Sequence, residues 1–445
     1  MVILSLKIWI YKKMGAKINA EWDRLRKVAV HTPGMEMFFG LLDPYASLYE
    51  RAFSQCDALR EHEILIHTLK NELKVDVVPL KKTIVSMADE NPVLRDELIN
   101  LAQDNISFTG NDQEVKMARE EMDKNRAKLD SEHYFNTALL NPCIELGSRE
   151  GSLMINLKVT EREPLSNLYF MRDQQIVTDK GMILSCMSKP QRTREPSLTQ
   201  LLWKFIKEPL IHEIQSPGTF EGGDFIPLKE FALIGLGDRT NRSGIEQMLK
   251  QGVDYDEIGV VHQPSHPLIP GDRRDPMVNM HLDTYFNIAS QGVAVGCELL
   301  LKNAPVEIYH HSEDGYIRAS EQMNLHDYIK NKGFDIINIT TLEQIAYASN
   351  FLCIKNGTVL AVEVERVAGA VLDKLESKAK IEPERYEKLL IQARKDYRKL
   401  RDEGQFFPHK KEIYQHNIDA YPLNLMNLTG GYGGAHCMTC PLKRT

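Results

Sequence analysis

Near its C-terminal end the chain carries the stretch Thr429-Gly430-Gly431-Tyr432-Gly433-Gly434-Ala435-His436-Cys437-Met438-Thr439-Cys440-Pro441. Glycines crowd the positions before Cys437, and glycine permits positive φ angles and a close approach of the backbone to a ligand. A cysteine presented by such a loop is a candidate nucleophile, because the thiolate is the most nucleophilic common side chain near neutral pH. The stretch therefore predicts a small-molecule site built around Cys437.

Three upstream stretches carry the acidic, basic and imidazole groups that such a site needs. They are Phe170-Met171-Arg172-Asp173, Phe220-Glu221-Gly222-Gly223-Asp224-Phe225 and His281-Leu282-Asp283-Thr284. Each alone has a plain structural explanation, because a strand-end aspartate is usually a turn former and a strand histidine is more often structural than catalytic. His281 and Asp283 are two residues apart, which predicts that they share one face of a strand. Burying two such polar groups without partners is costly, and this favours a functional role.

Length and composition are those of a globular protein with a sizeable core. The 445 residues suffice for one large domain or for two to three ordinary ones. Hydrophobic residues make up 42% and charged residues 26% of the chain, which is typical of a soluble protein. The formal net charge of -7 argues against a nucleic-acid partner, which would require a basic face. A mildly acidic chain suits a cationic small substrate.

The cysteines indicate a reducing compartment and no disulfide framework. Seven are spread over the chain, at positions 56, 143, 186, 297, 353, 437 and 440, without the dense spacing of secreted disulfide-rich domains. Cys437 and Cys440 form one C-x-x-C pair. A structural zinc site would need a second pair of ligands at comparable spacing, and the sequence has none. We therefore expect a cytoplasmic protein without a metal ion.

The segment formed by residues 2–11 is apolar, but it is too short to span a bilayer. Lys12 and Lys13 follow this run instead of preceding it, and no small-residue cleavage site is evident, so a signal peptide is disfavoured. We interpret residues 1–21 as an N-terminal extension, with Met1 and Met14 both candidate start positions. We expect no association with a membrane.

From residue 22 onward, short apolar strands alternate with helices, which indicates a mixed α/β fold. Strands are predicted at residues 25–31, 75–80, 168–171, 175–177, 182–186, 220–225, 231–235, 258–261, 281–286, 292–295, 306–309 and 359–364. Helices are predicted at residues 46–73, 197–207 and 243–251. Strand–strand–helix units recur roughly five times, without an exact sequence repeat.

Two segments differ from this pattern. Residues 84–145 are rich in Asp, Glu, Asn, Lys and Leu, and residues 115–131 have a strong helix propensity. We predict that residues 84–145 form an inserted, all-helical domain whose charge runs are solvated helix faces. Residues 367–402 form a second charged helical stretch, for which an oligomer contact or a lid is considered.

Together the four stretches match one class of chemistry. Carboxylates hold a planar guanidinium cation best, because they accept paired N–H bonds from it. A thiolate can attack the central carbon of the guanidinium, and a histidine oriented by a further carboxylate can move the protons. The bound cation, or a nearby positive charge, would itself favour the thiolate. The chain supplies the cysteine, the histidine and the acids that this chemistry requires.

These motifs, and their order along the chain, resemble those of the arginine deiminases of the guanidino-group modifying superfamily. The matching elements are Asn167-Leu168-Tyr169-Phe170-Met171-Arg172-Asp173, Phe220-Glu221-Gly222-Gly223-Asp224, His281-Leu282-Asp283-Thr284 and Gly433-Gly434-Ala435-His436-Cys437-Met438-Thr439-Cys440-Pro441. The resemblance implies a five-bladed α/β propeller of pseudo-fivefold ββαβ units over residues 22–445, with the site in the central channel. Residues 84–145 resemble the additional helical domain of that family.

The resemblance also implies roles for individual residues. Cys437 is the nucleophile, His281 the general acid/base and Glu221 its partner, while Asp173 and Asp283 hold the guanidinium. The remaining substrate-binding positions are Asn167, Arg192 and Arg239 for the α-carboxylate, with Arg194 as the alternative to Arg192, Phe170 for the aliphatic part, and Asp224 and Gly434.

The implied reaction converts L-arginine and water into L-citrulline and ammonia. It passes through a covalent S-alkylthiouronium on the cysteine, which forms with loss of ammonia and is then hydrolysed. No metal or organic cofactor is implied. We expect a cytoplasmic homo-oligomer, a dimer or a tetramer, that binds L-arginine and has no nucleic-acid or membrane partner.

One position departs from the family pattern. The family usually carries an arginine five residues before the nucleophile, in a loop that closes over the substrate, and here that residue is Tyr432. The arginine would add positive charge near the substrate carboxylate and the cysteine. With a tyrosine, the contacts to the α-carboxylate rest on Arg192 and Arg239, and specificity for free L-arginine is an open question.

Several alternatives share these residues. Within the superfamily they are an arginine dihydrolase that releases ornithine, a deiminase of another guanidino compound and an amidinotransferase. A non-catalytic arginine-binding protein would need neither the thiol of Cys437 nor the imidazole of His281. A cysteine protease would need an oxyanion hole, and it has no use for two guanidinium-binding carboxylates.

Overall fold

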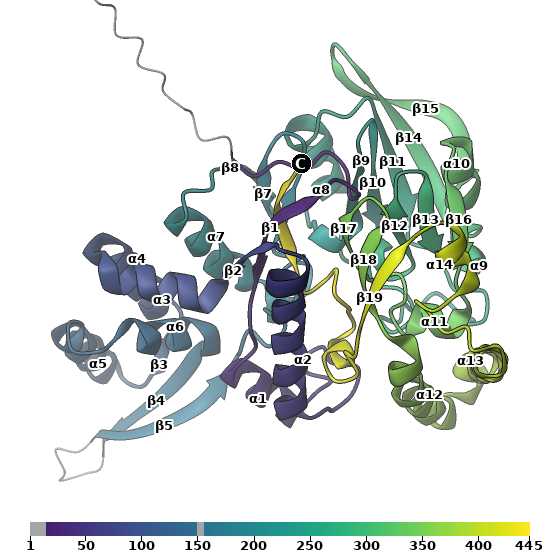
Figure 1. Cartoon of the computed structure of the whole chain (residues 1–445). Coiled ribbons are helices and arrows are strands. Elements are labelled where there is room, and N and C mark those ends of the chain that lie inside the picture. The colour runs from purple at the N-terminus through teal and green to yellow at the C-terminus, as the bar shows by residue number, and fades with distance from the viewer. Residues whose placement is uncertain (1–14, 149–154) are drawn as a thin grey trace, which may run out of the picture.

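The computed structural model describes residues 15–148 and 155–445. Within these two ranges the strands form six sheets, and one of them belongs to a separate lobe that Figure 1 shows in blue. None of the helices in the described part of the chain combines the length and the apolar character that a bilayer crossing requires. The apolar residues 2–11 and the candidate starts Met1 and Met14 lie outside the described residues.

The five sheets of the body share one strand pattern. In each, the central strand pairs antiparallel with one neighbour and parallel with the other. In four of them a short turn joins the antiparallel pair, and the parallel strand returns after a longer connection. A parallel partner can be reached only through a crossover, and helices fill these crossovers. The expected mixed α/β fold is confirmed, with five repeated strand units among the described residues.

The strand bounds follow the order of the units. They are β20 (Cys440–Arg444), β1 (Leu25–Val30) and β2 (Asp76–Pro79); β6 (Gln175–Val177), β7 (Met182–Leu184) and β8 (Leu210–Glu213); β9 (Phe225–Leu228), β10 (Phe231–Leu236) and β11 (Glu257–His262); β12 (Phe286–Ser290), β13 (Val293–Gly296) and β16 (Asp335–Asn338); β17 (Leu352–Lys355), β18 (Thr358–Val362) and β19 (Asp419–Leu423). A hairpin of β14 (Pro305–Ser312) and β15 (Gly315–Asn324) extends the β9–β10–β11 sheet beyond β11.

The helices of the body lie mainly in the connections between these strands. Their bounds are α1 (Met35–Leu42), α2 (Gln55–His67), α7 (Glu195–Phe205), α8 (Arg242–Gln247), α9 (Glu298–Leu301), α10 (Leu325–Asn331), α11 (Thr341–Ile345), α12 (Val364–Ile381), α13 (Pro383–Glu403) and α14 (Lys411–Gln415). The predicted helix at 46–73 is shorter than expected, because residues 46–54 form turns and bends before Ser54 caps α2.

The first unit is closed by both ends of the described chain. Strand β20 pairs antiparallel with β1, and the two lie side by side near the centre of Figure 1. The Arg444 guanidinium, buried in this joint, bonds the Glu21 carboxylate at 2.9 Å. The boundary predicted at residue 22 is therefore too late: Ala16, Ile18 and Ala20 are buried in the body, and the alternation of small apolar residues fits an extended segment against a sheet.

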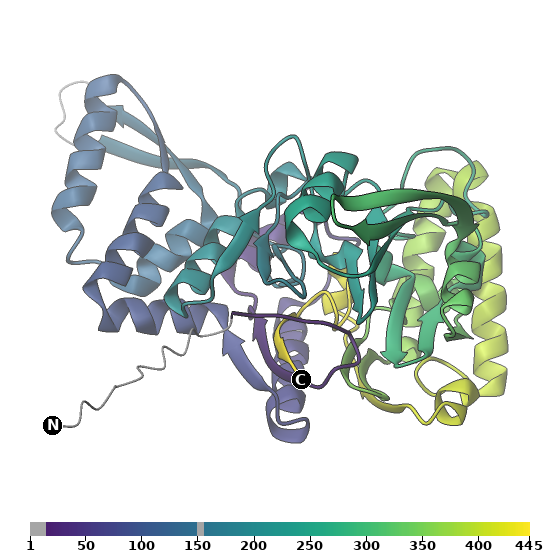
Figure 2. The ribbon, with the colours of Figure 1, turned by 90° about the horizontal axis from the view of Figure 1, so that it is seen from above.

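The charged stretch at 367–402 is a pair of helices in one crossover. Helices α12 and α13 pack against each other between β18 and β19, at the end of the molecule opposite the inserted lobe (Figures 1 and 2). Pro383 starts α13, where its missing N–H is tolerated. Val367, Val371 and Leu375 on α12 are fully buried, so the apolar face of this helix is already covered by the body. A role in oligomer contacts or as a lid stays a prediction.

The inserted lobe lies between β2 and β6, and it is not all helical. Its helices are α3 (Leu80–Glu90), α4 (Pro92–Asp104), α5 (Asp112–Asn125) and α6 (Ser131–Leu140), and its strands are β3 (Ser107–Thr109), β4 (Pro142–Ser148) and β5 (Ile155–Arg162). The strands form one sheet of their own in the order β3–β4–β5. The helical prediction for 84–145 holds for the four helices and is wrong for β3 and β4. These strands are stabilised by pairing partners that local propensity does not reveal.

We expect the joint between the two chain ends to carry much of the stability of the body. Arg444→Met leaves the Glu21 carboxylate without its nearest cation in a buried position, and losing one partner of a buried pair typically costs about 3–5 kcal/mol. The midpoint of thermal unfolding, measured by circular dichroism, should fall by several degrees.

The matched control is Arg401→Met, because Arg401 is exposed in the last turn of α13 and lies outside the buried joint. Surface changes of this kind are close to neutral. Equal midpoints for the two variants would contradict a stabilising role of the Glu21–Arg444 pair.

Candidate active site

The sequence motifs lie on turns, and the three predicted strands at 168–171, 220–225 and 281–286 are not observed as predicted. Residues 168–171 form turns, Gly222–Asp224 and Leu282–Thr284 are single 3-10 turns, and β9 and β12 begin only at Phe225 and Phe286. His281 and Asp283 therefore do not share a strand face. A turn aims successive side chains in different directions, and these two residues contact different partners.

Equivalent turns come together from all five units. Asp173 precedes β6, Glu221 precedes β9, His281 and Asp283 precede β12, and Cys437 precedes β20, each within five residues of the strand. The remaining unit contributes Asn350, two residues before β17. Because each of these strands is the first of its unit, the repeated topology brings the ends of five separate segments to one place.

Two glycines allow this close approach. A Cβ atom at Gly222 would lie 2.1 Å from the carbonyl oxygen of Arg172, and one at Gly223 would lie 2.8 Å from Nδ1 of His281. Neither position has room for a side chain. The Gly-Gly pair therefore packs the turn that carries Glu221 directly against the turns that carry Asp173 and His281.

The Cys437 thiol is buried, with 1% of the residue exposed. Its Sγ lies 3.4 Å from Oδ2 of Asp283, and its backbone N–H donates to Oδ1 of Asn350 at 3.1 Å. Burial raises the pKa of this thiol well above its usual value, and the charges of Asp283 and Asp173 raise it further. In this arrangement the thiol is protonated and donates to Asp283.

His281 is held as an imidazolium by the surrounding acids. Its Nε2 lies 2.9 Å from Oε2 of Glu221, and its Nδ1 lies 3.8 Å from Oδ1 of Asp173 and makes no hydrogen bond to any described residue. Burial alone would lower the pKa of His281. The charges of Asp173, Asp224 and Glu221 outweigh burial and raise the pKa to about 9. The group can therefore donate a proton at neutral pH.

Asp173 is already paired with an arginine of the chain itself. Oδ2 of Asp173 accepts from Nη1 of Arg192 at 2.7 Å, and Oδ1 accepts from the Gly223 N–H at 3.2 Å. The rest of the Arg192 guanidinium is bound by Glu195 through Nε and Nη2. Arg192, predicted to bind a substrate carboxylate, is thus in the site but placed against two acids.

Of the other predicted substrate-binding residues, three lie at the cluster, whereas Asn167 and Arg194 contact other parts of the chain. Arg239 points its Nη1 at Glu221 (3.5 Å), and Phe170 and Gly434 lie beside the glycine loop of Cys437. Asn167 donates to the carbonyl oxygen of Ser47 at 2.7 Å. Arg194, the alternative to Arg192, is half exposed and pairs with Glu163 at 3.0 Å, away from these groups.

Asp224 serves the local structure of the site. Its Oδ1 accepts from the Leu282 N–H at 3.0 Å and so joins the turn before β9 to the turn before β12. Burial raises the pKa of Asp224 to about 6, with the charge of His281 acting in the opposite direction. The carboxylate adds negative charge beside His281.

Sequence reasoning missed a group of buried residues behind the site. His436 donates from Nδ1 to Oδ2 of Asp283 at 2.8 Å, while Glu21 lies 3.6 Å from its Nε2 and from Nη1 of Arg172. Burial would raise the pKa of Asp283, but the hydrogen bond from His436, together with the charges of His436, His281 and Arg172, outweighs burial and lowers the pKa of this carboxyl. His436 directly precedes Cys437 in the sequence, and this adjacency could have predicted that its side chain lies near the site.

Asn350 was missed for a different reason. Its Oδ1 accepts from the N–H groups of both Gly434 and Cys437, at 2.7 and 3.1 Å, so it fixes the loop that presents the thiol. No residue type near position 350 distinguishes it from an ordinary loop asparagine. Its place before β17, equivalent to that of the other site residues, becomes visible only when the five units are known.

Tyr432 occupies the position of the usual arginine in a left-handed conformation, with φ at 76° and 9% of the residue exposed. Burial raises the pKa of its hydroxyl, and the charges of Glu50 and Asp275 raise it further. The loop before it is held by Glu61, which accepts from the N–H groups of Asn427 and Leu428. The site therefore has a neutral phenol, close to acids, where the family pattern has a cation.

A metal ion is the other candidate occupant of this cluster. Donor atoms of Asp173, Glu221 and His281 all lie within 4.8 Å of one another. However, the same carboxylates face Arg192 at 2.7 Å and Arg239 at 3.5 Å. Guanidinium groups of the chain already bind both carboxylates, and His281 held as an imidazolium has no lone pair to offer a metal ion, so the donor set favours a protonated histidine instead.

A family model described as arginine deiminase matches residues 46–444, which is most of the chain. The chain belongs to the arginine deiminase family. An arginine deiminase of Halobacterium salinarum is 25% identical, and the match covers 96% of each chain. An arginine deiminase of Staphylococcus haemolyticus is 27% identical, over 80% of this chain and 90% of the relative.

A solved structure has the same fold at low sequence identity. The ternary complex of AgrE with ornithine and NAD+ superposes with a TM-score of 0.50 and 11% identity, over 94% of this chain and 39% of that chain. The arginine deiminase family accounts for the motifs around Asp173, Glu221, His281 and Cys437.

The charge of Glu221 should be visible in the titration of His281. Glu221→Gln removes a negative charge 2.9 Å from the imidazole, so the pKa of His281 should fall from about 9 toward its ordinary value. Nuclear magnetic resonance titration of histidine-labelled protein measures this shift, with His281→Ala identifying the resonance.

Glu307→Gln is the matched control, because Glu307 contacts a different histidine, His262, at 2.8 Å. That variant should leave His281 unchanged. A His281 that titrates near pH 6.5 in the unaltered protein would show that the acids around it do not hold the proton.

Proposed function

We propose that this protein is an arginine deiminase that hydrolyses L-arginine to L-citrulline and ammonia. The observation that carries the proposal is the placement of the Cys437 thiol 3.4 Å from Asp283, in a buried cluster with Asp173, His281 and Glu221. A cationic, planar substrate suits a nucleophile beside buried carboxylates, because carboxylates accept paired N–H bonds from a guanidinium. Membership of the arginine deiminase family supports the same substrate.

Substrate binding itself activates the nucleophile in this proposal. The carboxylates of Asp283 and Asp173 raise the pKa of the Cys437 thiol in the empty site. A guanidinium bound between them neutralises their field and adds its own positive charge, which lowers the pKa of the thiol. The thiol gives its proton to solvent water, so the thiolate forms when the cation that it attacks is in place, and the empty site holds an unreactive thiol.

The first half of the reaction forms a covalent intermediate. The Cys437 thiolate adds to the central guanidinium carbon and gives a tetrahedral adduct. His281 gives its proton to one terminal nitrogen of the adduct, the C–N bond breaks and ammonia leaves. Cys437 is then linked to the substrate as an S-alkylthiouronium. The pKa of His281, raised to about 9, keeps this proton available at neutral pH.

The second half releases the product. Neutral His281 takes a proton from a water molecule, and the resulting hydroxide adds to the same carbon. The second tetrahedral adduct collapses: its carbon–sulfur bond breaks, its hydroxyl proton passes to the departing sulfur of Cys437, and the thiol and the ureido group of citrulline are left. Glu221 orients the imidazole in both halves through its contact with Nε2. The balance is L-arginine plus water to L-citrulline plus ammonia, without an oxidant or a cofactor.

Arg192 has a double role in this proposal. Glu195 binds it through Nε and Nη2, while Nη1 reaches Asp173. An incoming guanidinium competes with Arg192 for Asp173, and the displaced Nη1 is then available for the substrate α-carboxylate. Together with Arg239, it would supply the positive charge that Tyr432 does not.

We also infer that the five body sheets are the blades of an α/β propeller with the site on its axis. The supporting observations are the common strand pattern and the five equivalent turns that meet around Cys437. The cytoplasmic location and a dimeric or tetrameric assembly belong to the same proposal, as properties expected of a reduced-cysteine metabolic enzyme.

Product analysis tests the proposed function directly. The purified protein is incubated separately with L-arginine, agmatine and a peptidyl-arginine, and citrulline, ornithine, urea and ammonia are measured. We expect citrulline and ammonia from free L-arginine and no dependence on an acceptor amine. Ornithine as the final product would identify a dihydrolase. Turnover confined to agmatine, which lacks the α-carboxylate, would show that the substrate assignment is wrong.

The nucleophile assignment has its own test. Cys437→Ala should reduce kcat to less than about one thousandth, because losing a covalent catalyst costs at least this much, while the circular dichroism spectrum stays unchanged. Cys440→Ala, in the same C-x-x-C pair, should retain turnover because its thiol faces the carbonyl of Pro441 in β20. Loss of activity in both variants alike would favour a joint role of the two thiols.

A further inference from the structure

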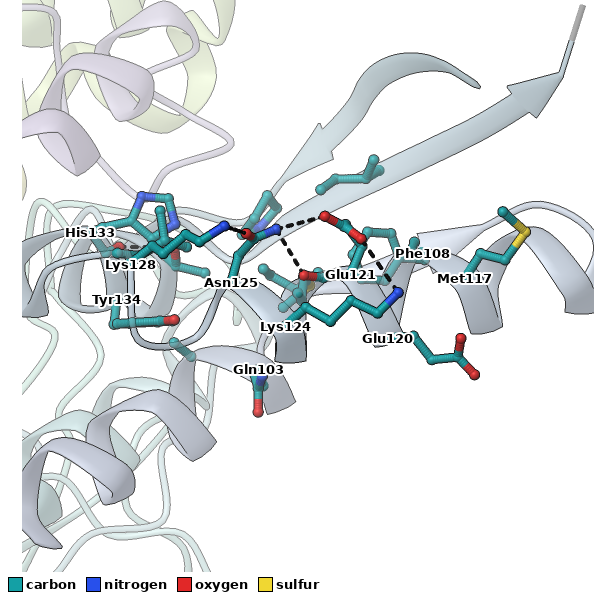
Figure 3. A pocket seen from close by; sticks show the side chains of 18 of the residues that line it. Gln103, Phe108, Met117, Glu120, Glu121, Lys124, Asn125, Lys128, His133 and Tyr134 are labelled. Carbon is teal, nitrogen blue, oxygen red and sulfur yellow. Dashed lines mark hydrogen bonds and ion pairs between the residues drawn. The ribbon is translucent and has the colours of Figure 1, made fainter. Parts of the chain in front are cut away.

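The inserted lobe contains a cavity that lies apart from the candidate active site. Its volume is about 820 Å3, and α4, β3, α5, β4 and the start of α6 enclose it (Figure 3). Its apolar lining includes Ile106, Phe108, Met117, Met122, Ile144 and Leu146. None of its lining residues belongs to the cluster around Cys437. The volume is in the range of small-molecule sites, roughly 300–1,000 Å3.

Helix α5 contacts β3 and β4 but covers its apolar face only partly. None of its 14 residues is buried, whereas the shorter α6 buries five. Met117 is 50% exposed although it lines the cavity. A capping box between Asn111 and Glu114 fixes the start of α5, so the helix is well specified by its sequence. The lobe thus holds a well-capped helix over an apolar hollow that no side chain of residues 15–148 and 155–445 fills.

The charged groups around this cavity are distributed unevenly. Glu120 and Glu121 have lysine partners at 4.0 and 3.8 Å, from Lys116 and Lys124. Lys128 and His133 have no carboxylate within 4.0 Å among residues 15–148 and 155–445, and Lys128 contacts only the neutral Asn125 (Figure 3). Both follow the C-terminal end of α5, so one end of the cavity carries unpaired basic groups.

The apolar part of the cavity extends along α5 away from these groups. From Met117 to Asn125 the helix rises about 12 Å, at 1.5 Å per residue. The cavity therefore combines an apolar length with one basic end. A carboxylate suits that end, because it pairs with an ammonium and accepts a hydrogen bond from an imidazole N–H.

We propose that the inserted lobe binds an amphipathic monocarboxylate in this cavity. Its hydrocarbon part lies under α5 against Phe108 and Met122, and its carboxylate meets Lys128 and His133. Filling the hollow gains the dispersion contacts that the apolar lining lacks, and removes its apolar surface from water. The site is independent of the proposed catalytic function, since it shares no residue with it.

A pair of probes tests both the apolar and the charged part of the proposal. Isothermal titration calorimetry with the full chain compares 6-phenylhexanoate with 6-phenylhexanamide, which has the same hydrocarbon part and no charge. We expect saturable binding of one 6-phenylhexanoate per chain, about tenfold tighter than the amide, as for hydrogen bonds to charged groups. Equal affinity for the two probes would overturn the carboxylate assignment, and no saturable binding of either would overturn the site.

Two variants locate the bound molecule. Ala118→Phe places a ring in the cavity and should abolish binding of both probes, whereas Lys116→Phe adds the same ring on the exposed side of α5 and should not. Lys128→Gln, at an exposed position where the fold tolerates change, should weaken 6-phenylhexanoate about tenfold and leave the amide unchanged. Turnover of L-arginine should be the same in all three. Retained binding in Ala118→Phe would place the molecule elsewhere.

Discussion

The antiparallel pairing of β20 with β1 is the constraint on which the rest of the molecule depends. It joins two segments more than 400 residues apart, and it places the turn that carries Cys437 beside the turns of the four other units. The buried contact between Glu21 and Arg444 lies at the same joint, and Glu21 also approaches His436 and Arg172. The closure of the fold and the support of the loop that carries Cys437, the proposed nucleophile, are therefore one structural feature.

The electrostatics of the site follow from burial. Asp173, Asp283, Glu221 and Asp224 are all buried, and each would be costly to bury alone. Arg192 pairs with Asp173, Arg239 and His281 pair with Glu221, and His436 pairs with Asp283, at distances between 2.7 and 3.5 Å. One thiol remains without a cation, and the neighbouring carboxylates keep it protonated. A positively charged substrate completes this charge balance, which connects the binding of a guanidinium to its chemistry.

The parts of the chain that contribute no residue to the site are additions to the repeated strand unit. The α12–α13 pair fills the crossover between β18 and β19, where other units have a shorter helix, and the β14–β15 hairpin extends a sheet at its edge. The lobe containing α5 lies between β2 and β6, outside any crossover between paired strands. Insertions at such connections leave the converging turns in place, because the pairing of the central strands is unaffected.

The sequence by itself determined the candidate chemistry of this protein, because the candidate reactive groups stand in short motifs: Asp173, Glu221, His281, Asp283 and Cys437 were all predicted from local patterns and family resemblance. It also indicated the alternation of strands and helices, since apolar periodicity is a local property. The tertiary structure decided which turns meet, that Arg192 pairs with Asp173, that Asn350 holds the loop of Cys437 while His436 contacts Asp283, and that the lobe contains a sheet beside its hollow. These features depend on contacts between residues distant in sequence, and no local pattern of side chains encodes such a contact.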